Sequence, residues 1–145
     1  MPYAEKSKIP TELISHYLSA NYQVTIGSDI STLSINQPSK SLSQLFTSSG
    51  HHCAIFITAF NPFSQQKELN ENLINNEHLQ LTLKQHTLQI FKGISTDPSE
   101  LWTAEESFLA LGINLEISKV LGTQFNQNAI VWIGSDTTPR LILLR

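Results

Sequence analysis

The longest run of apolar and β-favouring residues in the chain extends from Cys53 to Phe60. A strand with one wet face alternates apolar and polar residues, so an almost unbroken apolar run predicts a strand that is covered on both faces. Asn61-Pro62 follows and ends the strand, because proline has no N–H for the sheet and restricts the residue before it to extended geometry. The pattern therefore predicts a central strand that stops at this turn.

A helix is predicted directly after the turn, with Ser64 as its N-cap. Leucines and one asparagine recur at spacings of three and four between Leu69 and Leu83 and form one stripe. Asn76 lies inside this stripe and Asn72 lies one turn before it. An unpaired buried amide costs about 1–3 kcal/mol, so both amides need a hydrogen-bond partner. Backbone of a neighbouring strand or turn is one candidate partner, and a ligand in a polar pocket is the other.

Further helices and strands alternate along the chain. Helices are predicted over residues 11–20, 39–49 and 115–125, and strands over residues 22–26, 88–94, 107–113, 129–133 and 140–144. Residues 27–38 are predicted as a loop with a brief extended piece at 32–35. We expect an N-terminal arm over residues 1–10 and a single globular domain over residues 11–145. The predicted fold class is α/β (α+β), with a mixed β-sheet of about five to six strands and helices packed on it.

Length and charge narrow the function classes. A chain of 145 residues buries enough surface to fold without disulfides or metals. The net charge of −3 and the pI near 5.9 argue against general nucleic-acid binding, which needs a basic face. The first ten residues lack the apolar segment of a signal peptide, and no stretch approaches the ~20 apolar residues of a membrane span. We therefore expect a cytoplasmic protein with no membrane partner.

The metal-ligating residue types are too few to predict a metal site. His51 and Cys53 share one side of an extended chain and His52 lies on the other, whereas a structural zinc site needs four ligands. Cys53 is the only cysteine, so it forms no internal disulfide, and its position at the start of an apolar strand is typical of a small buried side chain. We expect no metal and no cofactor.

Polar residues collect at the predicted end of the central strand and the start of its helix. The candidate binding residues are Thr58, Asn61, Ser64, Asn72 and Gln127. Strand ends of open α/β sheets bind ligands, and a helix N-terminus offers N–H groups to an anion.

Glu105 and Glu106 precede the strand predicted over residues 107–113, and neighbouring residues of a strand point to opposite faces. Glu106 is the candidate catalytic acid or base. The alternative for Glu106 is a solvated glutamate or one paired with Lys92.

Four segments give the chain a resemblance to a known family. They are T-A-F-N-P-F-S at residues 58–64, E-N at 71–72, E-E-S-F-L-A-L-G-I at 105–113 and F-N-Q-N-A-I-V-W-I at 125–133. This pattern resembles the bacterial family called domain of unknown function 3293, over roughly residues 13–144. Phe60 stands where tryptophan is more usual in the family, and Asn126 where glycine is more usual. The resemblance implies little about activity.

Two classes of function remain open. The first is a small-molecule site at the end of the central strand, enzymatic or not, for an anionic or nucleotide-like ligand. The second is a non-catalytic interaction or regulatory module in which the polar residues only tie turns to helices. The chain contains no phosphate-binding loop, dinucleotide fingerprint or nucleophile elbow, and this absence favours neither class.

Overall fold

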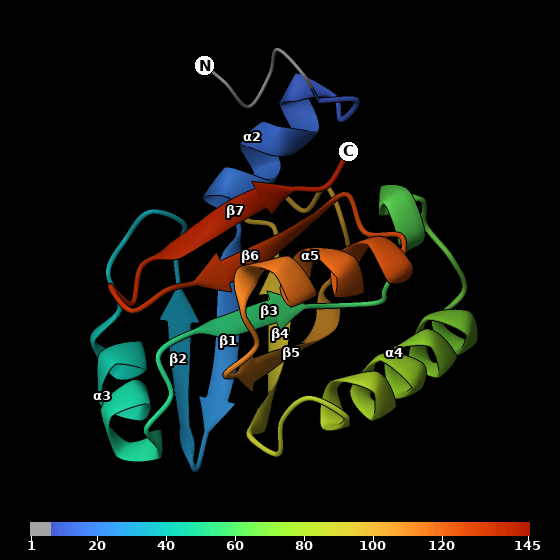
Figure 1. The fold of residues 1–145 in the computed structure, drawn as a ribbon. Coiled ribbons are helices and arrows are strands. Elements are labelled where there is room, and N and C mark those ends of the chain that lie inside the picture. The colour runs from blue at the N-terminus through green and yellow to red at the C-terminus, as the bar shows by residue number, and fades with distance from the viewer. Residues whose placement is uncertain (1–6) are drawn as a thin grey trace.

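The computed structural model describes residues 7–145, which form seven strands, four α-helices and one 3-10 turn (Figure 1). The strands are β1 (Asn21–Ile26), β2 (Asp29–Leu33), β3 (Ala54–Ile57), β4 (Ile90–Thr96), β5 (Glu105–Leu111), β6 (Ala129–Ile133) and β7 (Pro139–Leu143). The helices are α2 (Thr11–Ser19), α3 (Lys40–Ser49), α4 (Leu69–Lys84) and α5 (Leu115–Gln124), and the 3-10 turn is η1 (Pro62–Ser64). Within these residues, no helix combines the length and apolar character that crossing a bilayer requires.

All seven strands form one sheet in the order β2-β1-β4-β5-β3-β6-β7. The α+β class predicted from the sequence is confirmed, with seven strands rather than five to six. Every pairing is antiparallel, so the expectation of a mixed sheet is wrong. The helix α4 leads from β3 to β4, but β5 lies between these two strands, so the connection does not create a parallel pair. The additional strand, β2, comes from the polar stretch that was predicted as a loop and pairs with β1.

The strand β3 lies inside the sheet, paired with β5 on one side and β6 on the other. All four of its residues are buried, which confirms the central strand predicted from the apolar run. Its side chains alternate between two cores. Phe56 contributes to the core packed against α2 and α3, and Ile55 and Ile57 contribute to the core packed against α4 and α5. The sheet is thus covered by helices on both faces (Figure 1).

The helix α4 does not begin where the sequence predicted. Ser64 was expected as its N-cap, but the helix starts at Leu69, with Glu68 at the cap position and no capping side chain. Phe63 and Ser64 adopt left-handed backbone conformations, so the chain turns once at η1 before it reaches the helix. The expectation for Ser64 as a cap is therefore wrong, and its hydroxyl is free for a different contact.

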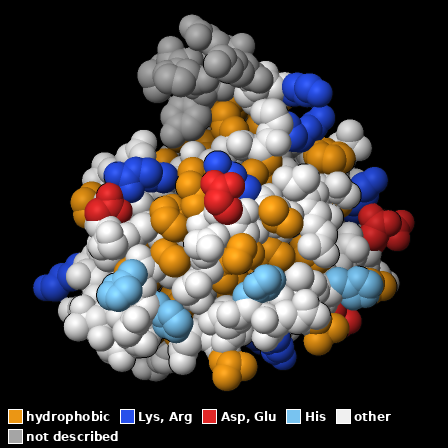
Figure 2. Space-filling model, in the orientation of Figure 1, with side chains coloured by type: hydrophobic (Ala, Val, Ile, Leu, Met, Phe, Trp, Pro, Cys, Tyr) orange, Lys and Arg blue, Asp and Glu red, His pale blue; other side chains and the backbone are white. Residues whose placement is uncertain are grey.

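The predicted N-terminal arm lies partly outside the described residues, since residues 1–6 are not among them. Ser7 and Ile9, from the rest of the arm, contact the domain. The Ser7 hydroxyl donates to the Arg145 carbonyl (2.7 Å), and the Ile9 side chain is buried in the core beside α2. Figure 2 shows the face that carries α4 and α5, where hydrophobic side chains mix with polar ones and the Lys and Arg side chains are scattered.

Candidate functional site

A small cavity of about 60 Å³ lies on the α2 side of the sheet, beside the end of β3. Its walls come from the helix α2, from the turn after β3, and from one face of the strands β1, β4, β5, β3, β6 and β7. A cavity of this size holds a few water molecules or the head of a small organic molecule. The residues that line it include the tyrosines Tyr17 and Tyr22, the carboxyl group of Glu105, and the indole of Trp102.

The turn that follows β3 is strained. Asn61, Phe63 and Ser64 all have positive φ angles, of 47°, 55° and 59°, although none is glycine. Such conformations cost about 1–3 kcal/mol each and persist only where surrounding contacts enforce them. Strain of this kind concentrates at binding and catalytic sites.

Asn72 of α4 provides the contacts that enforce the turn. Its Oδ1 accepts from the Asn61 backbone N–H (2.9 Å), and its Nδ2 donates to the Asn61 Oδ1 (2.9 Å). The Lys67 backbone N–H donates to the same Asn61 oxygen (2.9 Å). These bonds leave the Asn61 side-chain N–H₂ pointing across the turn toward β5.

The Asn61 Nδ2 donates to the Oε2 of Glu105, at 2.8 Å. Glu105 is the first residue of β5 and lies on the same face as Ser107 and Leu109, so its side chain turns toward α2 and into the cavity wall. Burial raises the pKa of the Glu105 carboxyl to about 7, although the hydrogen bond from Asn61 acts in the opposite direction. The cavity therefore contains a carboxyl group that is poised between its two protonation states at neutral pH.

Glu106, the residue predicted as catalytic, points to the opposite face and is exposed. Its backbone carbonyl accepts hydrogen bonds from Thr58 Oγ1 (2.6 Å) and Asn76 Nδ2 (2.8 Å), but its carboxyl group does not line the cavity. No ion pair with Lys92 occurs within residues 7–145. The structure thus places the neighbouring residue, Glu105, at the site instead.

A second polar group lies on the cavity wall formed by α2 and β6. The Tyr17 hydroxyl and the Ser64 hydroxyl form a short hydrogen bond, and Asn128 Nδ2 donates to both, at 3.1 and 3.2 Å. Asn128 Oδ1 accepts from Arg145 Nη1 (2.9 Å), and the Arg145 guanidinium lies 4.3 Å from the centre of the Phe63 ring. Burial raises the pKa of Tyr17, so its hydroxyl stays protonated at neutral pH.

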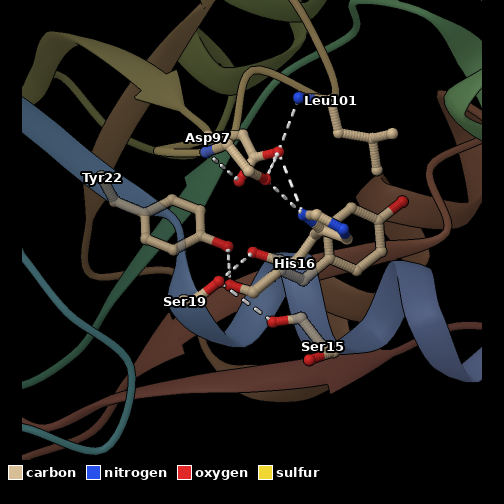
Figure 3. A network of polar contacts seen from close by, with 8 residues as sticks. Ser15, His16, Ser19, Tyr22, Asp97 and Leu101 are labelled. Carbon is tan, nitrogen blue, oxygen red and sulfur yellow. Dashed lines mark hydrogen bonds and ion pairs between the residues drawn. The ribbon is translucent and has the colours of Figure 1, made fainter.

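The loop between β4 and β5 forms the remaining wall and is fastened to α2 by a carboxylate (Figure 3). Asp97 is buried and accepts from the Leu101 backbone N–H (2.8 Å), from Ser99 Oγ (3.0 Å) and from His16 Nδ1 (3.1 Å). Burial opposes ionisation of Asp97, but these hydrogen bonds outweigh it and hold the pKa below its ordinary value.

The Trp102 ring follows in this loop, and its centre lies 5.7 Å from that of Tyr17. The Trp102 Nε1 is buried and has no hydrogen-bond partner within residues 7–145. A buried donor without a partner costs about 1–3 kcal/mol, so packing against α2 must hold this ring in place.

The structure places the five predicted binding residues at or next to the cavity, but most of their polar groups serve the fold. Thr58 Oγ1 donates to a backbone carbonyl, and Gln127 Nε2 donates to the carbonyls of Phe60 (3.2 Å) and Phe125 (3.3 Å). Asn72 is buried behind the turn and does not line the cavity. Asn61 and Ser64 do line it, and each bonds to another residue of the cavity wall.

Several residues that line the cavity were not predicted as site residues, among them Tyr17, Trp102, Glu105 and Asn128. Strand alternation separates Glu105 from Glu106 but does not select between them, because Leu109 and Leu111 make one face of the strand apolar and Phe108 and Ala110 make the other face apolar. Tyr17 and Trp102 carry no comparable signal, since only the folded chain brings α2 and the loop before β5 together.

Metal-ligating side chains do not gather at the cavity. Within the described part of the chain, no group of three or more His, Cys, Asp or Glu side chains could hold a metal ion. His51 packs against Gly112, and Cys53 Sγ donates to the Ile113 carbonyl (3.4 Å). Burial raises the pKa of the Cys53 thiol, which makes it a poorer ligand and nucleophile.

Comparison with known proteins gives one match. A family model described as a protein of unknown function, DUF3293, matches residues 57–130, just over half of the chain. Curated proteins and solved structures gave no match. The matched segment contains Asn61, Glu105 and Asn128, and it therefore includes most of the polar wall of the cavity. The chain belongs to the DUF3293 family of proteins of unknown function.

Proposed function

We propose that the cavity binds a small polar molecule and that Glu105 is the group that recognises it. One observation carries this proposal: the Glu105 carboxyl lies in a cavity lined partly by aromatic rings, with Asn61 as its one hydrogen-bond partner within residues 7–145. Its second oxygen, Oε1, accepts no hydrogen bond from the described residues 7–145. Removing a carboxyl group from water with so few hydrogen bonds lowers the stability of the fold. Carboxyl groups of this kind cluster at binding and catalytic sites.

The strained turn supports the same proposal. Asn61, Phe63 and Ser64 all depart from ordinary backbone geometry, and Asn61 and Ser64 line the cavity. Asn72 holds the turn in this form and so fixes the direction of the Asn61 amide. The polar wall is therefore held in place by contacts within the protein, which is what a specific site requires.

The chemistry of the lining favours a neutral or cationic molecule over the anionic or nucleotide-like ligand expected from the sequence. Glu105 is acidic, and no Lys, Arg or His side chain is among the described residues that line the cavity. A volume of about 60 Å³ also suits a small head group better than a nucleotide. At neutral pH a carboxyl group with a pKa about 7 can accept or donate a proton, so Glu105 is suited to general acid or base chemistry on the bound molecule.

A thermal-shift screen tests this proposal. Small amines, amides, alcohols and carboxylic acids are added to the wild-type chain and to the Glu105→Gln and Glu106→Gln variants. A ligand at a hundred times its dissociation constant stabilises the folded chain by about 2.7 kcal/mol, which moves the midpoint by several degrees. We expect at least one compound to stabilise the wild type and Glu106→Gln but not Glu105→Gln.

A screen in which no small compound stabilises the wild type would contradict the proposal. It would favour the alternative, a non-catalytic interaction or regulatory module.

We also propose that the protein is cytoplasmic. This location is tested by cell fractionation.

A further inference from the structure

We infer that the molecule bound in this cavity carries a small ammonium group, which is placed against the Glu105 carboxylate and the surrounding aromatic rings. The inference rests on the proposed function, because it assigns the chemical class of the ligand at the same site. A primary amine of a few heavy atoms, protonated at neutral pH, is the ligand class that follows.

Charge is the first argument. The ionisable groups among the described lining residues are the Glu105 carboxyl and the hydroxyls of Tyr17 and Tyr22, and none of them is a cation. Arg145 lies close by, but its guanidinium is engaged by Asn128 and by the ring of Phe63. The carboxylate form of Glu105 therefore has no positive partner in the cavity, and a bound cation would supply one.

The aromatic walls are the second argument. Tyr17, Tyr22, Phe56, Phe60 and Trp102 line the cavity together. Tyr22 and Phe56 meet edge to face with ring centres 5.4 Å apart, and Tyr17 and Trp102 are tilted by 50°. Aromatic faces attract cations through their quadrupole, and proteins use such walls to bind ammonium groups.

Hydrogen-bond capacity is the third argument. An ammonium group presents three donors and no acceptor. The wall offers matching acceptors, because Glu105 Oε1 accepts no hydrogen bond within residues 7–145 and two serines, Ser95 and Ser107, also line the cavity. Ser107 Oγ donates to the Glu105 carbonyl (3.0 Å), which leaves its lone pairs free to accept. The site can thus satisfy an ammonium group on several sides.

The affinity of the cavity for an amine should depend on pH. Tyr17 on α2 and Tyr22 on β1 face Glu105 and are uncharged at neutral pH, since burial raises the pKa of both hydroxyls. Arg145 acts on Tyr17, and Asp97, whose lowered pKa keeps it ionised in the neutral range, acts on Tyr22. Glu105 is thus the group in the cavity that titrates in this window. Protonating Glu105 removes the negative charge, so affinity for an amine should fall by about tenfold per pH unit below the pKa of Glu105.

The experiment is a titration of the full chain, labelled with ¹⁵N, with four small probes. Methylammonium carries charge and donors, methanol is its neutral counterpart, tetramethylammonium keeps the charge without donors, and acetate has the opposite charge. The readout is the indole N–H signal of Trp102. The Trp132 indole donates to the Ile113 carbonyl (3.0 Å) outside the cavity lining and serves as the internal control.

We expect methylammonium to shift the Trp102 signal at pH 8 more strongly than methanol, tetramethylammonium or acetate, and to bind about tenfold more weakly at pH 6. Glu105→Gln should abolish the shift and Glu106→Gln should leave it unchanged. The pH dependence of the wild type is a second readout that does not depend on the folding of a variant. Saturable shifts with acetate or methanol but not with methylammonium would overturn the inference while the proposed small-molecule site stands. No saturable shift of Trp102 with any probe would overturn both.

Discussion

The side chain of Asn61 donates to the Glu105 carboxyl at 2.8 Å, although 44 residues separate them in the chain. This bond joins the strained turn after the central strand β3 to the first residue of β5. Because Asn72 fixes the Asn61 amide from the other side, the position of the carboxyl group depends on α4 as well as on the sheet. Changing any of these three side chains should therefore shift the Glu105 carboxyl group in the cavity.

Replacing Glu105 with glutamine should stabilise the fold at and above neutral pH. The folded chain holds a proton on Glu105 up to about pH 7, whereas the unfolded chain loses it near the ordinary value of 4.5. Between these values the folded state binds more protons, so stability falls as pH rises through this window. Glutamine carries no charge and can still accept from Asn61. We expect a gain of about 1–3 kcal/mol at pH 8 and little change at pH 4.

Urea unfolding of both chains at pH 4, 6 and 8 measures this effect. Glu106→Gln is the control, because its side chain is exposed on the other face. A gain that is equal at all three pH values would contradict desolvation as its cause.

Two buried amides of α4 should prove to be structural. Asn76 accepts from the Ala59 N–H (2.8 Å) and donates to the Glu106 carbonyl, and Asn72 pairs with Asn61. Asn72→Ala and Asn76→Ala should each cost about 1–3 kcal/mol, because a buried backbone or side-chain group loses its partner. Asn70, which is exposed on the same helix, is the control and should change little when replaced by alanine. Equal denaturant midpoints for the three variants would refute this structural role.

Asp97 should act as a clamp between α2 and the loop that carries Trp102. Asp97→Asn weakens hydrogen bonds from Leu101, Ser99 and His16, and we expect a loss of about 1–3 kcal/mol at pH 7. The pKa of Asp97 is lowered in the fold, so its contribution is present above the ordinary carboxyl pKa and disappears as pH falls through the lowered value. The difference between variant and wild type should therefore shrink in acid.

Hydrogen exchange of the Leu101 amide tests the clamp directly. This amide should exchange faster in Asp97→Asn, and unchanged exchange would speak against the clamp. Asp29→Asn, at an exposed position in β2, provides the comparison.

Gly122 in α5 should resist substitution by alanine. In an exposed helix interior, alanine is more favourable than glycine by about 1 kcal/mol. At Gly122 an added Cβ would lie 2.4 Å from Leu144 Cδ1 and 2.7 Å from Ile130 Cγ2, so neighbouring side chains would have to move. We expect Gly122→Ala to destabilise the fold, and a higher melting temperature for this variant would contradict the packing described here.

Local signals predicted much of the fold. The helices predicted over residues 39–49 and 115–125 correspond to α3 and α5, where Ser39 and Asn114 act as side-chain caps and Gly50 ends α3 in the left-handed conformation. Non-local features were not predictable in this way. The strand β2 forms in a polar stretch because β1 offers it an edge, and Ser64 loses its expected capping role because tertiary contacts hold the turn after β3 in left-handed geometry.

In the candidate site, too, local signals in the sequence predicted some residues and non-local packing determined the others. Alternation along β5 places Glu105 and Glu106 on opposite faces. Which of the two enters a cavity depends on how α2 packs on the finished sheet. Asn61, Ser64 and Gln127 were predicted near the site because they follow strand and helix signals. Tyr17 comes from α2, nearly ninety residues before Glu105, and reaches the site only through packing of that helix on the sheet.

The most direct test of the account is a pH titration of the Glu105 side-chain carboxyl carbon by NMR in the chain without ligand. We predict a titration midpoint about 7, because burial in the cavity opposes ionisation, and a further rise in Asn61→Ala, because the hydrogen bond that favours the carboxylate is lost. The signal is assigned by its disappearance in Glu105→Gln. A midpoint near the ordinary value of 4.5 would mean that water solvates this carboxyl, and it would contradict a desolvated recognition site at the end of β3.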